Sequence, residues 1–141
     1  MTDYAGTNSN CFACGINNDK GLKLRFAKLD DYVETVWTVP DHFQGWDNLT
    51  HGGIISTILD ETMSHAIFKL LGENVVTGEF TVRFVKPLFV GTTIIARGYI
   101  EQDKGRLVEA RSEIHDTKGN LIAKSTGRFV RIANEQKLEY K

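Results

Sequence analysis

The sequence predicts an α+β fold in which one long central helix is wrapped by a curled antiparallel sheet of five to six strands. Helical periodicity is confined to one stretch, from Gln44 to Gly72, and the segments on both sides of it alternate apolar and polar residues as half-buried strands do. A single helix covers so many strands only if the sheet twists and curls around it. These observations predict one layer of sheet against one helix.

The length of 141 residues favours one domain, residues 1–141, which is long enough to bury a core. The composition, 41% hydrophobic and 25% charged, is that of an ordinary globular protein, and a formal charge of -1 gives no general attraction to phosphate backbones. We therefore expect no nucleic-acid partner. The apolar runs are too short to span a membrane and the first residues lack the pattern of a signal peptide, so we expect no membrane partner and a cytoplasmic location.

Turn-forming residues dominate residues 1–21, which we expect to form an irregular lead-in. Apolar residues then alternate from Leu22 to Phe26 and again from Val33 to Val39, which predicts a β-hairpin with one buried face. The loop from Asp41 to Thr50 follows. Its aromatic residues, Phe43 and Trp46, are expected either to cap the core or to shape a site.

The predicted helix has its apolar residues on one face, at Ile55, Ile58, Leu59, Met63, Ala66, Ile67 and Leu70. Gly72 is well placed to end it. With about 100° of rotation per residue, Asp60 falls on the border of the apolar face, and Ser64 follows on the same ridge. Glu61 lies well away from that face, where we expect it to meet solvent or a base such as Lys104.

The chain after the helix alternates in the strand pattern over residues 76–88, 92–102, 106–115 and 121–132. Short turns join the last three segments, so we expect them to be antiparallel neighbours. The polar tail, residues 133–141, is expected to be flexible. The second face and the open edge of such a sheet still need cover, and pairing with another copy supplies it most simply, so we predict a homodimer or homotetramer.

The start of the helix and its first carboxylate are the candidate site. The first N–H groups of a helix have no partner within it and lie at the positive end of its dipole, so His51-Gly52-Gly53 favours a partly anionic oxygen nearby. The alternative is a plain loop-to-helix turn. A carboxylate at the edge of a buried face, such as Asp60, suits a general base or nucleophile, and the alternative is a capping or salt-bridged side chain.

Cys11 and Cys14 form a single CxxC, which fits a disulfide, a redox pair or half of a zinc site. A structural zinc site normally has four ligands, and no second CxxC follows. The histidines have no common ligand spacing; they are His42, His51, His65 and His115. We expect two reduced, partly buried thiols and no bound metal or cofactor.

Three stretches of the chain resemble one family. The segment HGGIISTILD, the opening CFACGINNDKGLKLRF and the segment VVTGEFTVRFVKPLFVG resemble the hotdog-fold thioesterases, and more narrowly their PaaI-like branch. The similarity covers about residues 10–132. The HGG motif with a carboxylate nine residues beyond its histidine is fairly specific for the fold and the reaction class, and much less so for the substrate.

The resemblance implies roles for particular residues. The N–H of Gly52, with that of Gly53, is expected to polarise the thioester carbonyl as an oxyanion hole. Asp60 is expected to act as general base on water or to attack the acyl carbon directly. Thr77 is expected to position the water or the substrate from across a dimer interface, and His51 to order the turn.

Further candidates for substrate binding come from the same comparison. Some relatives carry an asparagine in the loop ahead of HGG; that position falls here near Gln44 or Gly45, and Asn48 lies closer to the motif. The candidate substrate-binding residues are therefore Gln44, Asn48, His51, Gly53 and Ser64.

The function implied by the resemblance is that of an acyl-CoA thioesterase, which hydrolyses a medium-chain or aryl acyl thioester to the free acid and the thiol. The partner is then acyl-CoA or another acyl thioester, such as one on a carrier protein. One alternative is an acyl thioester hydratase or dehydratase on the same fold, using His51 with a carboxylate. Another is a non-catalytic module that binds acyl ligands.

Overall fold

The structure is a computed structural model and describes residues 10–132. Six strands and one long helix follow in the order β1 (Ala27–Lys28), β2 (Tyr32–Thr38), α1 (Gly52–Leu71), β3 (Val75–Phe84), β4 (Thr93–Asp103), β5 (Leu107–Asp116) and β6 (Leu121–Arg131), with a short 3₁₀ turn at Asp41–Phe43. The first nine residues of the predicted lead-in and the predicted flexible tail, 133–141, lie outside the described residues.

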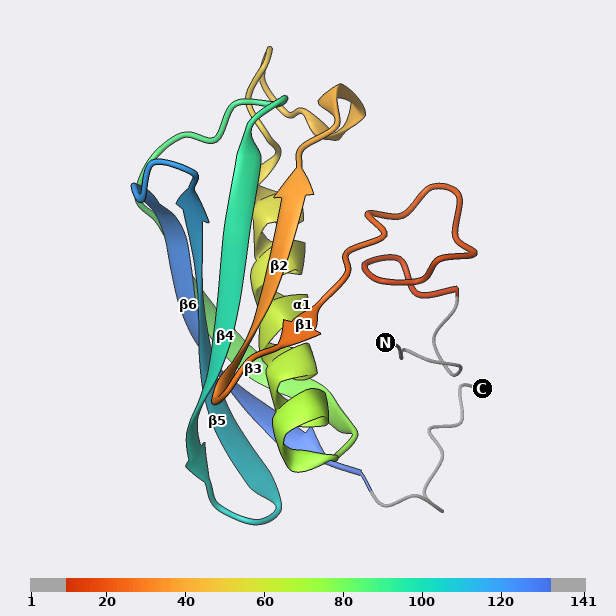
Figure 1. Cartoon of the computed structure of the whole chain (residues 1–141), viewed down its shortest axis with the longest axis vertical. Helices are drawn as coiled ribbons and strands as arrows, with labels where there is room; N and C mark the ends of the chain where they lie inside the picture. Colours follow the sequence, from red (N-terminus) through yellow and green to blue (C-terminus); the bar gives the residue numbers. More distant parts are fainter. Residues whose placement is uncertain (1–9, 133–141) are drawn as a thin grey trace.

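The six strands form one sheet in the order β1-β2-β4-β5-β6-β3, and every neighbouring pair is antiparallel. Figure 1 shows α1 lying along one face of this twisted sheet. The predicted α+β class is therefore confirmed, and so is the prediction that the three segments after residue 92 are antiparallel neighbours. Within the described residues, no helix is both long and apolar enough to cross a membrane.

Helix α1 begins and ends where the sequence predicts. Gly72 follows its last turn with a φ of 71° and donates its N–H to the carbonyl of Phe68, the left-handed stop that glycine adopts without strain. The face toward the sheet is buried at Ile55, Ile58, Leu59, Thr62, Met63, His65, Ala66 and Ile67. Leu70, which was predicted to share this face, is half-buried and packs against the edge of the core.

The helix packs most closely on β4 at Gly98. A Cβ added there would lie 2.6 Å from the carbonyl oxygen of Thr62, so a side chain at this position would push the helix off the sheet. Two buried hydroxyls between the layers are satisfied, since Ser112 Oγ donates to the carbonyl of Leu59 at 2.9 Å and lies 2.7 Å from Ser125 Oγ. These contacts fix the position of the helix along the sheet.

The predicted first strand, Leu22 to Phe26, is wrong, because β1 comprises only Ala27–Lys28. Leu22, Leu24 and Phe26 are buried, as their alternation indicated. However, the N–H groups of Leu22 and Leu24 donate to carbonyls of the lead-in, those of Phe12 and Ala13, each at 2.9 Å. Alternation reports which side chains are buried and not which segment supplies the hydrogen bonds.

Strand β3 is an edge of the sheet and ends at Phe84, earlier than predicted. Beyond it the N–H groups of Val85 and Lys86 both donate to the carbonyl of Ile122, at 2.8 and 3.0 Å, which turns the chain away from the regular ladder. The free edge of β3 is ten residues long and has no strand beside it in the described part of the chain. Long unpaired edges of this kind are places where another chain can add.

Candidate active site

The start of α1 offers one uncommitted N–H. His51 is the N-cap residue, and its Nδ1 accepts the N–H of Gly53 at 2.8 Å. The Gly52 N–H, in contrast, donates to no protein group in the described part of the chain. A Cβ on Gly53 would lie 3.0 Å from His51 Nδ1, so any larger residue there would crowd the capping imidazole. Gly52 is therefore the available donor at the positive end of the helix.

The loop before the helix is held by its own side chains. The Oε1 of Gln44 accepts the backbone N–H of Asn48 at 2.8 Å, and Asn48 has a φ of 65°, a left-handed conformation that asparagine tolerates. His51 then donates its N–H to the carbonyl of Phe43 at 3.0 Å. The amide oxygen of Gln44 is thus used to close the loop, while both Gln44 and Asn48 are exposed beside the helix start.

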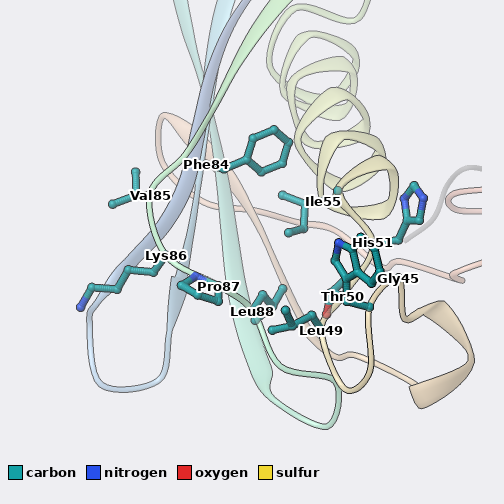
Figure 2. A pocket seen from close by; sticks show the side chains of 12 residues that line it. Gly45, Leu49, Thr50, His51, Ile55, Phe84, Val85, Lys86, Pro87 and Leu88 are labelled. Carbon is teal, nitrogen blue, oxygen red and sulfur yellow. The ribbon is translucent and has the colours of Figure 1, made fainter.

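A cavity of about 700 Å³ opens between this loop, the first turn of α1 and the end of β3. Figure 2 shows the side chains of Phe84 and Ile55 facing each other across it, with Lys86 directed away from both. The lining residues are Gly45, Trp46, Leu49, Thr50, His51, Gly52, Ile55, Phe84, Val85, Lys86, Pro87 and Leu88. The cavity is therefore mainly apolar, with the Gly52 backbone in its wall.

The rim of this cavity carries unusually exposed aromatic residues. Trp46 is 84% exposed and Phe84 is 55% exposed. Of the two loop aromatics considered from the sequence, Trp46 lines the cavity, whereas Phe43 packs on the core beside Trp37. Large apolar groups exposed together around a hollow are typical of a ligand-binding or subunit-binding surface.

Asp60 lies further along α1 and is paired with Thr77. The Thr77 hydroxyl donates to Asp60 Oδ1 at 2.8 Å. Burial raises the pKa of the half-buried Asp60 carboxyl above its usual range; the hydrogen bond from Thr77 opposes this rise, and the charge of Glu61 adds to it. A carboxylate of raised basicity held by a hydroxyl is suited to take a proton from water.

Thr77 reaches Asp60 within the same chain, so Asp60 receives this hydroxyl without a partner subunit. The reason lies in the topology: β3 returns antiparallel along α1, and the first residues of β3 pass the later turns of the helix. Ser64 is half-buried one turn beyond Asp60 and so belongs to this part of the helix rather than to the cavity.

Asp60 and Gly52 do not meet in one chain. Eight residues separate them on the helix, which corresponds to about 12 Å along the axis. Asp60 is accordingly absent from the residues that line the cavity. The structure thus places the predicted residues in two groups, His51, Gly52 and Gly53 with Gln44 and Asn48 at the helix start, and Asp60 with Thr77 and Ser64 two turns on.

Glu61 is neither solvated nor paired with Lys104, as had been expected. Its Oε2 lies 3.2 Å from His65 Nε2 and 3.8 Å from Cys11 Sγ, and Lys104 pairs with Glu109 instead. Burial tends to raise the pKa of Glu61, but hydrogen bonds from His65 and from the cysteine thiols outweigh it, so the pKa is lowered. The lead-in loop covers this side of the helix, which helical periodicity alone does not reveal.

A sequence model of the thioesterase superfamily matches residues 47–123, more than half of the chain. The chain belongs to the thioesterase superfamily. The matched residues of this superfamily member include the whole helix start, Asp60 and Thr77, and they extend into β6.

Individual relatives agree with this membership. The chain is 27% identical over 92 residues to acyl-coenzyme A thioesterase THEM4 of Xenopus laevis; this match covers 64% of the chain and 41% of the relative, so the chain spans less than half the length of that protein. The PaaI protein of E. coli, from the phenylacetic acid degradation operon, superimposes with a TM-score of 0.72 at 21% identity, over 78% of this chain and 84% of that one.

A thioesterase protein of Streptococcus pneumoniae, solved with coenzyme A, superimposes with a TM-score of 0.74 at 17% identity, over 80% of this chain and 91% of that one. At these identities the superpositions establish the fold, one helix against an antiparallel sheet of the hotdog type.

Two features of the structure were missed from the sequence. The alternating pattern around Phe84 predicts a strand but not the residue at which the strand ends. The strand ends at Phe84 itself, and the Phe84 side chain lines the cavity. The contact of Glu61 and His65 with the cysteines was also missed, although the spacing of four on one helix was a usable signal that these two side chains meet.

Proposed function

We propose that the protein is an acyl-CoA thioesterase, which hydrolyses an acyl thioester of medium chain length or with an aryl group to the free acid and coenzyme A. The observation that carries this proposal is the half-buried Asp60 carboxylate, of raised pKa and held by Thr77, on the same helix whose start offers a free N–H beside an apolar cavity. The frog relative named as an acyl-coenzyme A thioesterase and the streptococcal relative solved with coenzyme A support the choice of thiol.

The chemistry follows from these groups. The thioester carbonyl oxygen accepts the Gly52 N–H, and the positive end of the helix stabilises the negative charge that develops on that oxygen. Asp60 takes a proton from water while the water oxygen bonds to the carbonyl carbon. The tetrahedral intermediate then collapses, the carbon–sulfur bond breaks, and the thiolate leaves with the electron pair. Since a thiolate is a good leaving group, no second acid is needed.

We propose further that each site is built from two chains, because Gly52 and Asp60 are about 12 Å apart on one helix. Strand β3 links the two groups: Thr77 near its start bonds to Asp60, and the ring of Phe84 at its end lies 3.6 Å from the position of a Cβ on Gly52. A twofold axis through the middle of the free β3 edge sets Thr77 of one chain opposite Phe84 of the other. The Asp60 of one chain then faces the Gly52 of its partner.

The apolar cavity is the proposed acyl site. It adjoins the Gly52 N–H, and its volume of about 700 Å³ is within the range of sites for small ligands. Ile55 and Phe84 form opposite walls (Figure 2). Trp46 also lines the cavity and is 84% exposed. An acyl group seated between these side chains has its thioester carbon near the helix start.

The test is a thiol-release assay over a panel of acyl-CoA substrates with the wild-type protein and Asp60→Asn. We expect hydrolysis by the wild type and a fall in kcat of about 100-fold or more for the variant, since a general base typically contributes that much. Near-normal turnover by Asp60→Asn would remove Asp60 from the mechanism. Tight acyl-CoA binding without thiol release by the wild type would favour a binding module instead.

The hydratase alternative is less well supported by the geometry. It requires a histidine that exchanges protons with the substrate, but His51 Nδ1 accepts the Gly53 N–H and so caps the helix. We therefore propose hydrolysis alone, and the absence of any absorbance change with enoyl-CoA is the expected result of the corresponding assay.

A further inference from the structure

On the side of α1 that faces the lead-in, three potential metal ligands meet between the lead-in and the middle of the helix. The sulfur atoms of Cys11 and Cys14 and a carboxylate oxygen of Glu61 all lie within 4.8 Å of one another. These residues come from segments about fifty positions apart in the chain, and Figure 1 shows the lead-in, in red, on the side of α1 away from the sheet. Cys14 is only 2% exposed, so the cluster is largely removed from solvent.

The spacing of the cluster suits a small tetrahedral ion. With zinc–sulfur bonds of about 2.3 Å and zinc–oxygen bonds of about 2.1 Å, a tetrahedral site separates sulfur from oxygen by about 3.6 Å. The observed separation of Cys11 Sγ from Glu61 Oε2 is 3.8 Å. Little movement is therefore needed for these atoms to share one ion.

The surroundings favour the anionic forms of two of the three residues, Cys11 and Glu61. The N–H groups of Ala13 and Cys14 donate to Cys11 Sγ at 3.3 and 3.4 Å. The hydrogen bond from the Cys14 thiol, aided by these two N–H groups, lowers the pKa of Cys11 to about 6. The Glu61 carboxyl also has a lowered pKa, whereas the hydrogen bond to Cys11 and burial raise the pKa of the Cys14 thiol. A cation placed between them relieves the repulsion of these groups and displaces the remaining thiol proton.

A second layer of contacts orients the carboxylate. His65 Nε2 lies 3.2 Å from Glu61 Oε2, and the His65 ring stacks on Phe26 with centroids 4.2 Å apart. Hydrogen bonds of this kind to a ligating carboxylate are a regular feature of metal sites. Lys69 is a further basic group near this cluster, and its pKa is lowered by burial.

We propose that Cys11, Cys14 and Glu61 bind one zinc ion, with water as the fourth ligand and His65 holding the carboxylate in position. Two thiolates select a soft or borderline metal such as zinc over magnesium or calcium. The ion links the lead-in to α1 at the residue next to Asp60. The expectation of no bound metal rested on the lack of a second CxxC and of a common histidine spacing, whereas the third proposed ligand is the glutamate on the helix.

The test measures the metal directly. The full-length protein is purified under reducing conditions without chelator or added metal and its zinc content is determined; metal-free protein is then titrated with Zn²⁺ and with Co²⁺. We expect about one equivalent of metal and thiolate-to-cobalt charge-transfer absorption. Cys14→Ser is expected to weaken Zn²⁺ binding by about 100-fold or more, and His65→Gln by about 10-fold, which is the range seen for groups that orient ligands.

Asp19→Asn is the matched control, because Asp19 is an exposed acidic residue of the same lead-in and it should leave Zn²⁺ affinity unchanged. The Co²⁺ spectrum is measured on the wild-type protein, so it still tests the proposal if Cys14→Ser fails to fold. Wild-type protein that has both thiols reduced by thiol count and binds neither ion would overturn the proposal. A folded Cys14→Ser or Glu61→Gln that binds Zn²⁺ as tightly as wild type would overturn it as well.

Discussion

At the scale of single residues, the proposed chemistry depends on the unequal environments of two adjacent carboxyls. Asp60 is half-buried with one hydroxyl donor, so its pKa is raised, whereas Glu61 accepts from His65 and the cysteines, so its pKa is lowered. A base must be reasonably basic and yet ionised at the working pH. Of the two residues only Asp60 meets this requirement, chiefly because it is partly buried.

The hydrogen bond from Thr77 should be visible in the pH dependence. Activity needs ionised Asp60, so kcat/KM falls as the pH drops through the pKa of that carboxyl, and burial places this fall above the range of an ordinary aspartate. Thr77→Val removes a hydrogen bond that lowers this pKa, so we expect the acid limb of the kcat/KM profile to move to higher pH. A limb that stays in place or moves to lower pH would contradict this assignment of Thr77.

At the scale of elements, α1 has two separate uses. Its apolar face packs against the sheet and forms the core. Its first turn presents the Gly52 N–H, which stays free because His51 accepts the Gly53 N–H instead. Much of this could be predicted from the sequence, because the helical period, the HGG turn and the Gly72 stop are local signals. The contacts of Glu61 and the hydrogen bond of Leu22 to the lead-in could not be predicted. Periodicity indicates which side chains are buried, but it does not indicate which segment of the chain covers them.

Two substitutions at Gly52 test the role of its N–H group separately from the rest of the helix start. Gly52→Pro removes the N–H at the first helical position, where proline is tolerated, and the extended His51, with φ -61° and ψ 135°, is compatible with a following proline. Gly52→Ala keeps the N–H and meets only ordinary contacts with Phe84. We expect kcat to fall by about 100-fold for the proline variant and by only a few-fold for alanine. Equal activities would show that the N–H is not an oxyanion donor.

The close approach of α1 to β4 predicts a cost in stability. Gly98→Ala puts a methyl group 2.6 Å from the carbonyl oxygen of Thr62, and we expect the free energy of unfolding to fall by about 1–3 kcal/mol, as for other overpacked sites. Denaturant unfolding measures this, with Gly52→Ala as the control because its Cβ has room. A Gly98→Ala protein as stable as the wild type would mean that the helix can move off the strand freely.

At the scale of the whole molecule, one chain leaves the proposed site incomplete. The cavity and the Gly52 N–H lie at one end of α1, Asp60 and Thr77 lie two turns away, and the long edge of β3 has no neighbouring strand within the described residues. Pairing two β3 edges about a twofold axis covers the edge and brings the two half-sites together. The predicted homodimer or homotetramer is thus also what the proposed mechanism requires.

The most direct test of this arrangement combines two inactive chains. Asp60→Asn and Gly52→Pro are coexpressed with different affinity tags, and oligomers that carry both tags are purified and assayed for thiol release from acyl-CoA. If Gly52 of one chain works with Asp60 of its partner, each mixed dimer holds one intact site and should have about half of the wild-type activity, far above either parent. Mixed dimers as inactive as their parents would contradict a site shared between two chains.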